Sequence, residues 1–557
     1  MAAQHAIFFC AYCFEVQPSF NKTTPRTYYA CYFRYLFALP QKSTTTQSLP
    51  LPSLTMTLPK RQAAAQASHP PTQPPTHIAA QPDTFFAFLR HPDRRTDLLL
   101  LVAIHLLAFL FVAYTYPSPY TNADTGSYLA CSVSGKIDGY RPIGYSWFLS
   151  AFRAISASTF FVFAAQFWLH ALANSFFLLT LQYFVRPVRR ILFGAAAILL
   201  LISPATLFLT NALLSDSIFS TLSLVWLTSG IWLWRRFSLP MLLLHLLVMY
   251  WAVNVRYAGL FYPVFSALLL ALQNGKQRYY LPVLPLLIGV YIYVATKAEM
   301  RQRFGVDTFS AFSGWAQANN ATAVIPYIDL QPDAIASEAL RNIHQQVLSE
   351  PKEMYNTHNV MGTMFIWGKE RAGKKALFDY WQKNQGSDYT RAWVRVGMQM
   401  GNYAQLLRQH YPWLYVRHFI LPNAANIIVP RYDFLSYRNV AQTDEIVQQL
   451  YGDRSFEARH DWIATYIATL CRPANVLLWL LCAAAIGIVA SRYKQYAPSQ
   501  PHAAPIAAYL LLFIGIYAIF SAIAHPFYLR YALPLHAPQI ALLYLAAQYL
   551  YKIKAVK

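Results

Sequence analysis

The chain alternates long apolar runs with short polar connections. Ten runs of roughly 17 to 25 residues are long enough to cross a bilayer core of about 30 Å, the fifth and sixth being the shortest. They lie at about 98–116, 159–184, 191–210, 217–234, 239–254, 257–272, 280–296, 473–490, 505–524 and 532–551. This pattern predicts an all-α polytopic membrane protein with about ten transmembrane helices.

A long polar segment separates the seventh run from the eighth. Residues 297–472 have the composition of a soluble domain and contain helical patterns near 333–348, 369–383 and 403–421. The predicted domains are therefore an N-terminal region (1–97), a first membrane bundle (98–296) whose first outer loop is 117–158, a large, mainly helical outer segment (297–472), and C-terminal membrane helices with a basic tail (473–557).

Basic residues predict the orientation. Arg90, Arg94 and Arg95 precede the first run, and each even-numbered connection is basic. Because cytoplasmic loops carry the excess of Lys and Arg, the N-terminus is expected in the cytoplasm. Five segments then face the outer side: the first loop, the turns at 211–216 and 254–257, the large segment, and 525–531.

Composition agrees with the membrane assignment. The chain is 56% hydrophobic and 12% charged, whereas soluble domains are about a quarter charged. The formal charge of +22 follows from basic inner loops. Nucleic-acid binding would require a basic cluster interleaved with aromatic residues in a soluble domain, and the sequence contains none. The six cysteines have no metal-ligand spacing apart from one weak Cys10-x-x-Cys13, and they give no disulfide framework and no zinc site. The large polar segment contains no metal-ligand cluster.

The N-terminal region predicts no folded domain. Residues 1–55 lack the basic, apolar and small-residue regions of a signal peptide. Met56 begins a more ordinary cytoplasmic sequence, so the preceding stretch is interpreted as an over-extended start. Residues 60–83 are rich in Ala, Gln and Pro, a composition typical of disorder.

Acidic residues are rare in the membrane part. Of 23 acids, four precede residue 98, sixteen lie in 297–472, and Asp124, Asp138 and Asp216 are the remainder. All three are predicted on the outer face. Acids near hydrocarbon are costly and tend to line a functional site or an aqueous cavity, so this face is the candidate site.

Each acid has a functional and a structural interpretation. Asp124, shortly after the first run, is placed to accept a proton from a substrate hydroxyl, or to cap a helix before Thr125. Asp216 begins the fourth run, where it lines the site or pairs with the helix dipole. Asp138 fits a solvated turn residue better than a site residue.

Cationic residues occur on the same predicted face. Arg141 precedes a Pro and a Gly that impose a turn and hold its guanidinium over the outer cavity. Arg256-Tyr257 and Arg530-Tyr531 are two Arg-Tyr pairs at outer helix ends, and His525 precedes the second. Such arginines would bind a phosphate lipid headgroup; the alternative is that they snorkel or anchor the protein at the interface.

The order of these motifs resembles a known family. Asp124-x-x-x-Tyr128, Gly135 and Arg141-Pro-x-Gly-Tyr145 resemble the first outer loop of the C-type (GT-C) integral-membrane glycosyltransferases, in particular the bacterial protein-mannosyltransferase-like and aminoarabinose-transferase-like group, glycosyltransferase family 39-like. The segment 213–219 is similar to the acidic turn of that group. Val255-Arg-Tyr257 and Leu529-Arg-Tyr531 resemble its later Arg-containing turns.

The resemblance implies a GT-C-like bundle in a bacterial inner membrane. It implies a polyprenyl-phosphate sugar as donor and a lipid, glycan or protein as acceptor, with Asp124 as general base. The substrate-binding residues would be Arg141, Tyr145, Asp216, Arg256, Tyr257, His525, Arg530 and Tyr531. The outer segment would recognise the acceptor.

Two departures from the family pattern bear on cofactors. Ile143 stands where a second proline is common, and no second acid follows Asp124. No cofactor is therefore assigned, and the need for a divalent cation is left open. The alternatives are a transporter or flippase of lipid-linked glycans, a glycan polymerase or ligase, and a non-catalytic scaffold.

Overall fold

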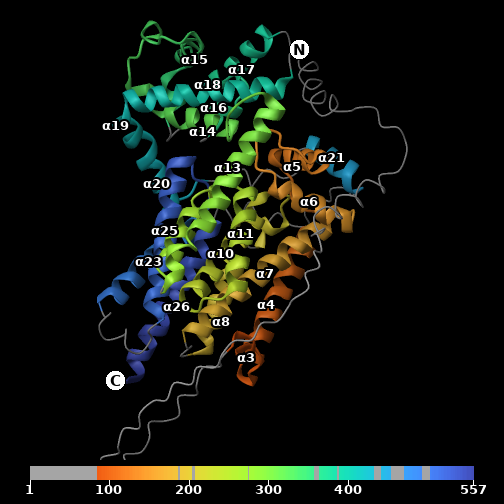
Figure 1. The fold of residues 1–557 in the computed structure, drawn as a ribbon, viewed down its shortest axis with the longest axis vertical. Helices are drawn as coiled ribbons and strands as arrows, with labels where there is room; N and C mark the ends of the chain where they lie inside the picture. The colour runs from red at the N-terminus through yellow and green to blue at the C-terminus, as the bar shows by residue number, and fades with distance from the viewer. Residues whose placement is uncertain are drawn as a thin grey trace, which may run out of the picture. The chain divides into compact units, whose positions relative to one another are not determined.

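The computed structural model describes residues 84–185, 189–203, 207–273, 275–356, 363–384, 388–431, 441–452, 470–491 and 502–556. The predictions for residues 1–83 lie outside these ranges. The described chain is built from α- and 3₁₀-helices, and its only strand-like pairings are two isolated bridges. Figure 1 shows long helices running side by side, with shorter helices gathered at one end.

Each apolar run corresponds to helical structure. Six described helical segments are long and apolar enough to cross a membrane: Pro92–Thr115, Thr159–Phe184, Ser215–Arg235, Lys276–Phe304, Arg472–Ser491 and Ala503–Ala524. The remaining runs contain α8 (Arg190–Leu201), α11 (Leu239–Val255), α12 (Tyr262–Ala271) and α26 (Leu533–Val556). The chain is thus a helical membrane protein with about six clear candidate spans, and the count of ten stays a prediction.

The third run was predicted too long. Its helix α8 ends at Leu201, and a 3₁₀ turn at Leu209–Asn211 follows instead of a continuous span to residue 210. The sequence explains the early end, since Pro204 disfavours helical backbone at the residue before it and cannot donate a helical hydrogen bond. The segment 209–211 is thereby free to form part of the candidate site.

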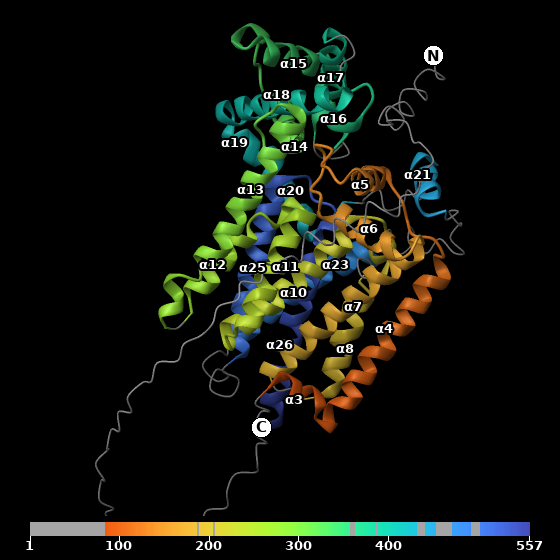
Figure 2. The same cartoon turned by 45° about the vertical axis from the view of Figure 1, so that its right-hand side comes forward.

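The first predicted outer loop is itself largely helical. It contains α5 (Ala123–Ser134) and α6 (Gly144–Ile155), joined by a turn with positive φ at Gly135 and Gly139. Both helices are too short to cross a membrane. They pack on each other beside the ends of the longer helices (Figure 2).

We call the residues of α14–α19 the helical cap. It contains α14 (Ala311–Ala321), α15 (Glu338–Leu348), α16 (Met364–Trp367), α17 (Ala372–Lys383), α18 (Tyr389–His410) and α19 (Pro412–Tyr415). These helices share a hydrophobic cluster that includes Trp315 and Trp393 and extends to Ile137 and Ile143 of the first loop. The cap corresponds to the middle of the large segment predicted from the sequence, and its helices lie together at one end of Figure 1.

Two helical connections join the cap to the long helices. α13 (Val283–Phe304) ends at Gly305, whose positive φ gives a left-handed helix end. The returning chain continues through the π-turn Val416–Ile420 into α20 (Leu421–Ile428), which packs against α25 (Ala503–Ala524). The cap is therefore fixed to the bundle at both of its ends.

Candidate functional site

Backbone pairing brings two distant turns together. The Tyr120 amide donates to the Asn211 carbonyl (2.7 Å), and the Leu213 amide donates to the Tyr120 carbonyl (2.9 Å). The Thr125 hydroxyl adds a bond to the Leu213 carbonyl at 3.1 Å. The turn before α5 is thus held against the turn before α10 (Ser215–Arg235), and each of these helices carries an acid in its first turn.

Asp124 is not the cap of α5. Asn122 occupies the N-cap position and its side chain accepts from the Asp124 amide (2.8 Å), while the Thr125 hydroxyl accepts from the Asn122 amide (3.0 Å). This capping box satisfies the helix start without the Asp124 carboxylate. The carboxylate is therefore available for other groups.

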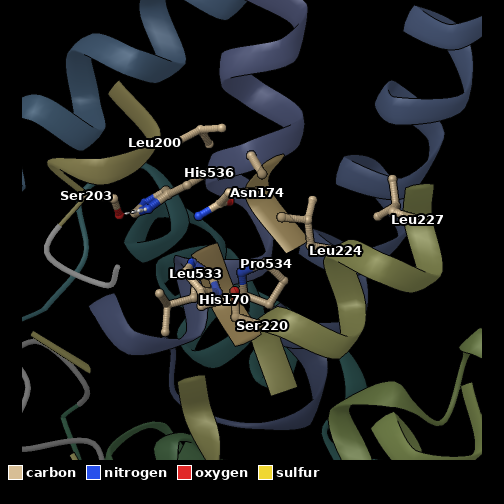
Figure 3. A pocket seen from close by; sticks show the side chains of 11 residues that line it. His170, Asn174, Leu200, Ser203, Ser220, Leu224, Leu227, Leu533, Pro534 and His536 are labelled. Atoms are coloured by element: carbon tan, nitrogen blue, oxygen red, sulfur yellow. Dashed lines mark hydrogen bonds between the residues drawn. The ribbon is translucent and has the colours of Figure 1, made fainter. Parts of the chain in front are cut away.

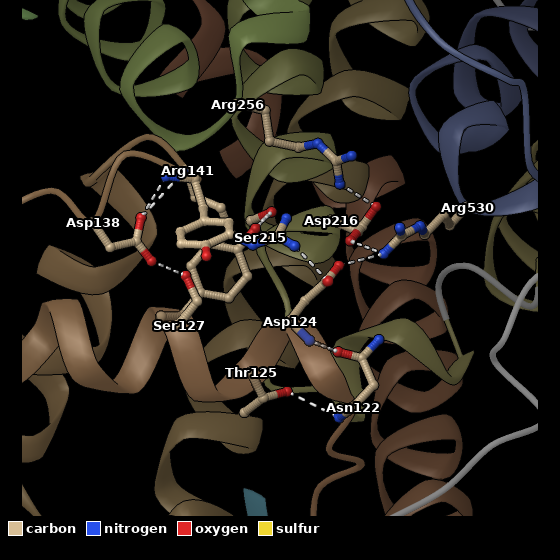
Figure 4. A network of polar contacts seen from close by, with 12 residues as sticks. Asn122, Asp124, Thr125, Ser127, Asp138, Arg141, Ser215, Asp216, Arg256 and Arg530 are labelled. Atoms are coloured by element: carbon tan, nitrogen blue, oxygen red, sulfur yellow. Dashed lines mark hydrogen bonds and ion pairs between the residues drawn. The ribbon is translucent and has the colours of Figure 1, made fainter. Parts of the chain in front are cut away.

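Five charged side chains form a continuous chain of ion pairs (Figure 4). Asp124 pairs with Arg141 and, at 3.2 Å, with Arg530. Arg530 also reaches Asp216 at 3.8 Å, and Asp216 pairs with Arg256. We call this set, in the order Arg141, Asp124, Arg530, Asp216 and Arg256, the ionic chain. The structure therefore joins five of the residues predicted separately from the sequence.

The ionic chain has an excess of positive charge. It contains three guanidinium groups and two carboxylates, and Asp216 and Arg530 are buried whereas Asp124, Arg141 and Arg256 retain partial exposure. Burial alone would raise the pKa of Asp124, but Arg141 and Arg530 outweigh it and the net pKa is lowered. Asp124 is thus ionised near neutral pH, and the two ends of the set, Arg141 and Arg256, are partly exposed cations.

Arg141 is oriented by a turn built around Asp138. The Asp138 carboxylate accepts from the backbone amides of Tyr140 (2.8 Å) and Arg141 (3.2 Å) and from the Ser127 hydroxyl. Gly139 supplies the positive φ of this turn (81°). Asp138 is a turn residue, as the sequence favoured, but it is half-buried and hydrogen-bonded rather than solvated.

Close backbone contact fixes the other side of the same turn. A Cβ atom on Gly144, the first residue of α6, would lie 2.6 Å from the backbone of Asn254. Glycine therefore permits α6 to approach the end of α11, two residues before Arg256. This contact holds the Arg141 turn next to the Arg256 turn.

Aromatic rings support the guanidinium groups. The Tyr531 ring lies 4.9 Å from the Arg256 guanidinium carbon and 5.0 Å from that of Arg530. The Tyr531 hydroxyl accepts from Arg530 at 3.1 Å, and the His525 ring lies 4.3 Å from the Tyr531 ring. His525 and Tyr531, both predicted site residues, thus border the ionic chain.

Two predicted substrate-binding residues have other partners. Tyr145 is fully buried, and its hydroxyl donates to Gln166 at 2.9 Å. Gln166 in turn donates to the carbonyls of Thr210 and Ala212, so Tyr145 supports the turn before α10. The Tyr257 ring packs against Phe309, with ring centroids 4.5 Å apart.

A buried amide that the sequence did not indicate holds the last loop. Asn423 of α20 donates to the carbonyls of Ala522 (2.8 Å) and His525 (2.7 Å), and it accepts from the Phe527 amide (2.7 Å). These three bonds fix the turn that leads to Arg530. An isolated asparagine in a polar segment gives no sequence pattern that could have revealed this role.

The ionic chain is poorly suited to a divalent cation. Among the described residues, no group of three or more His, Cys, Asp or Glu is placed to hold a metal. Asp124 and Asp216 are the available carboxylates, and each already pairs with two arginines. Guanidinium groups at these distances repel a divalent cation, so the two carboxylates are unfavourable ligands for a metal.

A small polar cavity lies among α7 (Thr159–Phe184), α10 and α26. It measures about 20 Å³ and is lined by His170, Asn174, Ser203, Ser220 and His536 together with apolar side chains. Figure 3 shows the Ser203 hydroxyl meeting the His536 ring, with Asn174 nearby. Ser220 follows Asp216 by one helical turn. The volume is sufficient for about one water molecule.

No protein-family model, curated protein or solved structure matches this chain.

Proposed function

We propose that this protein is a membrane glycosyltransferase that moves a sugar from a polyprenyl-phosphate donor to an acceptor hydroxyl. The proposal rests on the ionic chain, which places a partly exposed carboxylate between guanidinium groups at the ends of membrane-associated helices. The resemblance to GT-C glycosyltransferases supports the same activity. We assign the protein to a bacterial inner membrane, with its N-terminus in the cytoplasm and the ionic chain at the outer face.

The arginines are suited to a lipid-linked phosphate. Guanidinium groups bind phosphate through paired, charge-assisted hydrogen bonds. Arg256 and Arg141 are partly exposed, and with Arg530 they exceed the two carboxylates by one positive charge. A phosphate anion entering here would offset that excess. A neutral lipid would not.

Asp124 would serve as the general base. It removes the proton from the acceptor hydroxyl as the hydroxyl oxygen attacks the anomeric carbon of the sugar. The bond from that carbon to the phosphate oxygen breaks, and its electron pair leaves with polyprenyl phosphate, whose negative charge the arginines stabilise. The proton stays on the Asp124 carboxylate until product release.

The lowered pKa of Asp124 makes it a weak base before the donor binds. Arg141 and Arg530 cause this lowering, and both are candidates to bind the donor phosphate. When a guanidinium group turns towards the phosphate, Asp124 loses a cationic partner and its pKa rises. Donor binding would thus activate the base and restrict proton removal to the loaded enzyme.

Transfer assays test the proposal directly. Membranes carrying wild-type protein or Asp124→Asn, at matched expression, are incubated with radiolabelled polyprenyl-phosphate sugars. We expect transfer with the wild type and a loss of about 10²-fold or more with Asp124→Asn. Asp307→Asn serves as a control, since it removes a carboxylate that pairs with Lys297 and Arg301 and not with the ionic chain. Equal transfer by wild type and Asp124→Asn would refute the assignment of the base.

The products separate the nearest alternatives. A polymerase or ligase of lipid-linked glycans would use the same donor class but lengthen or transfer a whole glycan, which chromatography of the labelled product distinguishes. A transporter needs a passage through the bundle. The cavity among α7, α10 and α26 measures about 20 Å³, which is too small to hold a sugar.

A further inference from the structure

A cationic side chain in the helical cap has no acidic partner among the described residues. Lys374 of α17 lies with its ammonium group 5.5 Å from the Trp367 ring centre and 5.7 Å from that of Tyr389, and it donates to the Tyr389 hydroxyl at 3.0 Å. No carboxylate of the described ranges lies within 4 Å of it to form a salt bridge. The adjoining stretches 357–362 and 385–387 contain no Asp or Glu.

This arrangement is energetically unusual for a lysine. Lys374 is half-buried, and desolvation penalises an ammonium group that is partly removed from water without an acidic partner. Burial lowers the pKa of Lys374 to about 8, and the flanking rings offset only part of the penalty through cation–π contacts. The ammonium group has three donors and uses one of them on Tyr389. An anion delivered by a ligand would supply the missing partner.

An exposed aromatic surface adjoins the lysine. Trp367 is 41% exposed, although its ring stacks on Phe312 (6.2 Å, 28°) and Tyr140 (6.5 Å, 17°). Rigid aromatic groups presented in this way are typical of binding sites. Apolar ring faces suit the C–H faces of a sugar ring, and the neighbouring ammonium group suits an acidic substituent on that sugar.

The cluster is physically connected to the ionic chain. Tyr140 stacks on Trp393 of α18 with ring centroids 4.0 Å apart, and it directly precedes Arg141. A Cβ atom on Gly139 would lie 2.7 Å from Val394, so this turn and the cap are in close contact. A saccharide held at Trp367 would therefore lie on the side of the cap that meets the turn carrying Arg141.

We propose that Trp367, Lys374 and Tyr389 form a binding site for an anionic saccharide, a sugar bearing phosphate or carboxylate. The role of this saccharide as the acceptor rests on the proposed transferase function. The binding itself does not. Lys374 pairs with the anionic substituent, while Trp367 packs against the sugar ring.

Saturation-transfer NMR on the detergent-solubilised full chain tests this site. The probes are glucose 6-phosphate, glucuronate and glucose. Inorganic phosphate has no carbon-bound protons to observe, so its binding is measured by its competition with glucose 6-phosphate. We expect both anionic sugars to bind at least about tenfold more tightly than glucose or inorganic phosphate, a difference of about 1.4 kcal/mol. Lys374→Met should remove the preference for anionic sugars, and Lys374→Arg should retain it. Lys375→Met, one position along α17, is the matched control and should bind as the wild type does.

Each contrary result identifies a specific error. Unchanged binding by Lys374→Met would overturn the site. Equal affinity for inorganic phosphate and glucose 6-phosphate, with no effect of Trp367→Ala, would show an anion site without saccharide recognition and would also overturn the proposal. Lys374→Met should unfold at a temperature no lower than the wild type, because it removes an unpaired charge from apolar surroundings, so a loss of binding is not a loss of folding. Asp124→Asn should bind the probes normally, which keeps failure of the transferase proposal distinguishable from failure of this one.

Discussion

Arg530 Nη1 lies 3.2 Å from Asp124 Oδ2, although the two residues are 406 positions apart in the chain. The contact joins the first predicted outer loop to the last. Arg530 also reaches Asp216 at 3.8 Å, so one guanidinium group links both carboxylates of the ionic chain. Its loss should affect stability and donor binding together.

Arg530→Met tests this link. The substitution leaves each carboxylate with a single arginine, and we expect the free energy of unfolding to fall by about 1.5–3 kcal/mol, the range for hydrogen bonds to charged groups. The KM for the polyprenyl-phosphate donor should rise in the same variant. Thermal unfolding in detergent and donor titration measure the two effects. Arg395→Met, at an exposed position of α18, is the control, and an equally stable Arg530→Met would show that the carboxylates do not depend on this residue.

The charged residues of the site could be predicted from the sequence because charge is so rare in the membrane part. Asp124, Asp216 and the three arginines were each identified by charge and predicted sidedness. Their mutual pairing could not be predicted, since it depends on how turns separated by up to 406 residues pack. Both carboxylates lie in the first turn of a helix, where the helix dipole favours negative charge, so the structural and functional interpretations of Asp216 coexist.

Other features gave weaker sequence patterns. α5 and α6 are amphipathic and short, and they contain no apolar run of membrane-spanning length. The sequence therefore indicated only that a helix could begin near Thr125, and not the extent of the two helices. Pro204 does indicate the early end of α8. However, the residues on both sides of it are apolar, so the hydropathy pattern predicted one continuous run. Uncharged amides such as Asn122 and Asn423 act through local geometry, which a single sequence does not reveal.

His525 gives the protein an acid-sensitive element. Burial lowers its pKa to about 4, and nearby Arg256 and Arg530 add to the lowering. The unfolded chain, with a histidine pKa near 6.5, therefore binds more protons than the folded chain between these values. Stability should rise with pH across this window and fall as the pH drops from about 6.5 towards 4.

Unfolding temperatures at pH 5 and pH 7 measure this contribution. We expect a lower unfolding temperature at pH 5 for the wild type and a smaller difference between the two pH values for His525→Asn. Lys136→Met, at an exposed position of the first loop, should retain the wild-type difference. Identical pH profiles for wild type and His525→Asn would show that His525 does not contribute.

Asn423→Ala tests how the cap-side helix α20 positions Arg530. The substitution removes the partners of three backbone groups, the carbonyls of Ala522 and His525 and the amide of Phe527. Unpaired buried backbone groups are costly, so we expect a loss of at least about 2 kcal/mol in the free energy of unfolding. The turn from 525 to 530 should also become less ordered, with the Asn320 bond to the Ala524 carbonyl (3.2 Å) and the bridge between Arg431 and Tyr528 remaining.

The effect of Asn423→Ala on donor binding distinguishes positioning of Arg530 from a general loss of stability. Asn423 makes no contact with the ionic chain, so its loss should act by displacing Arg530. This displacement should raise the KM for the donor and leave the proton transfer by Asp124 largely intact. We therefore expect kcat to change less than KM. Asn384→Ala, which removes one exposed bond to the Tyr380 carbonyl, should change stability by no more than about 0.5 kcal/mol. If Asn423→Ala lowered stability but left the KM unchanged at a temperature where the protein stays folded, Arg530 would be positioned by its ion pairs alone, and α20 would serve only to attach the cap.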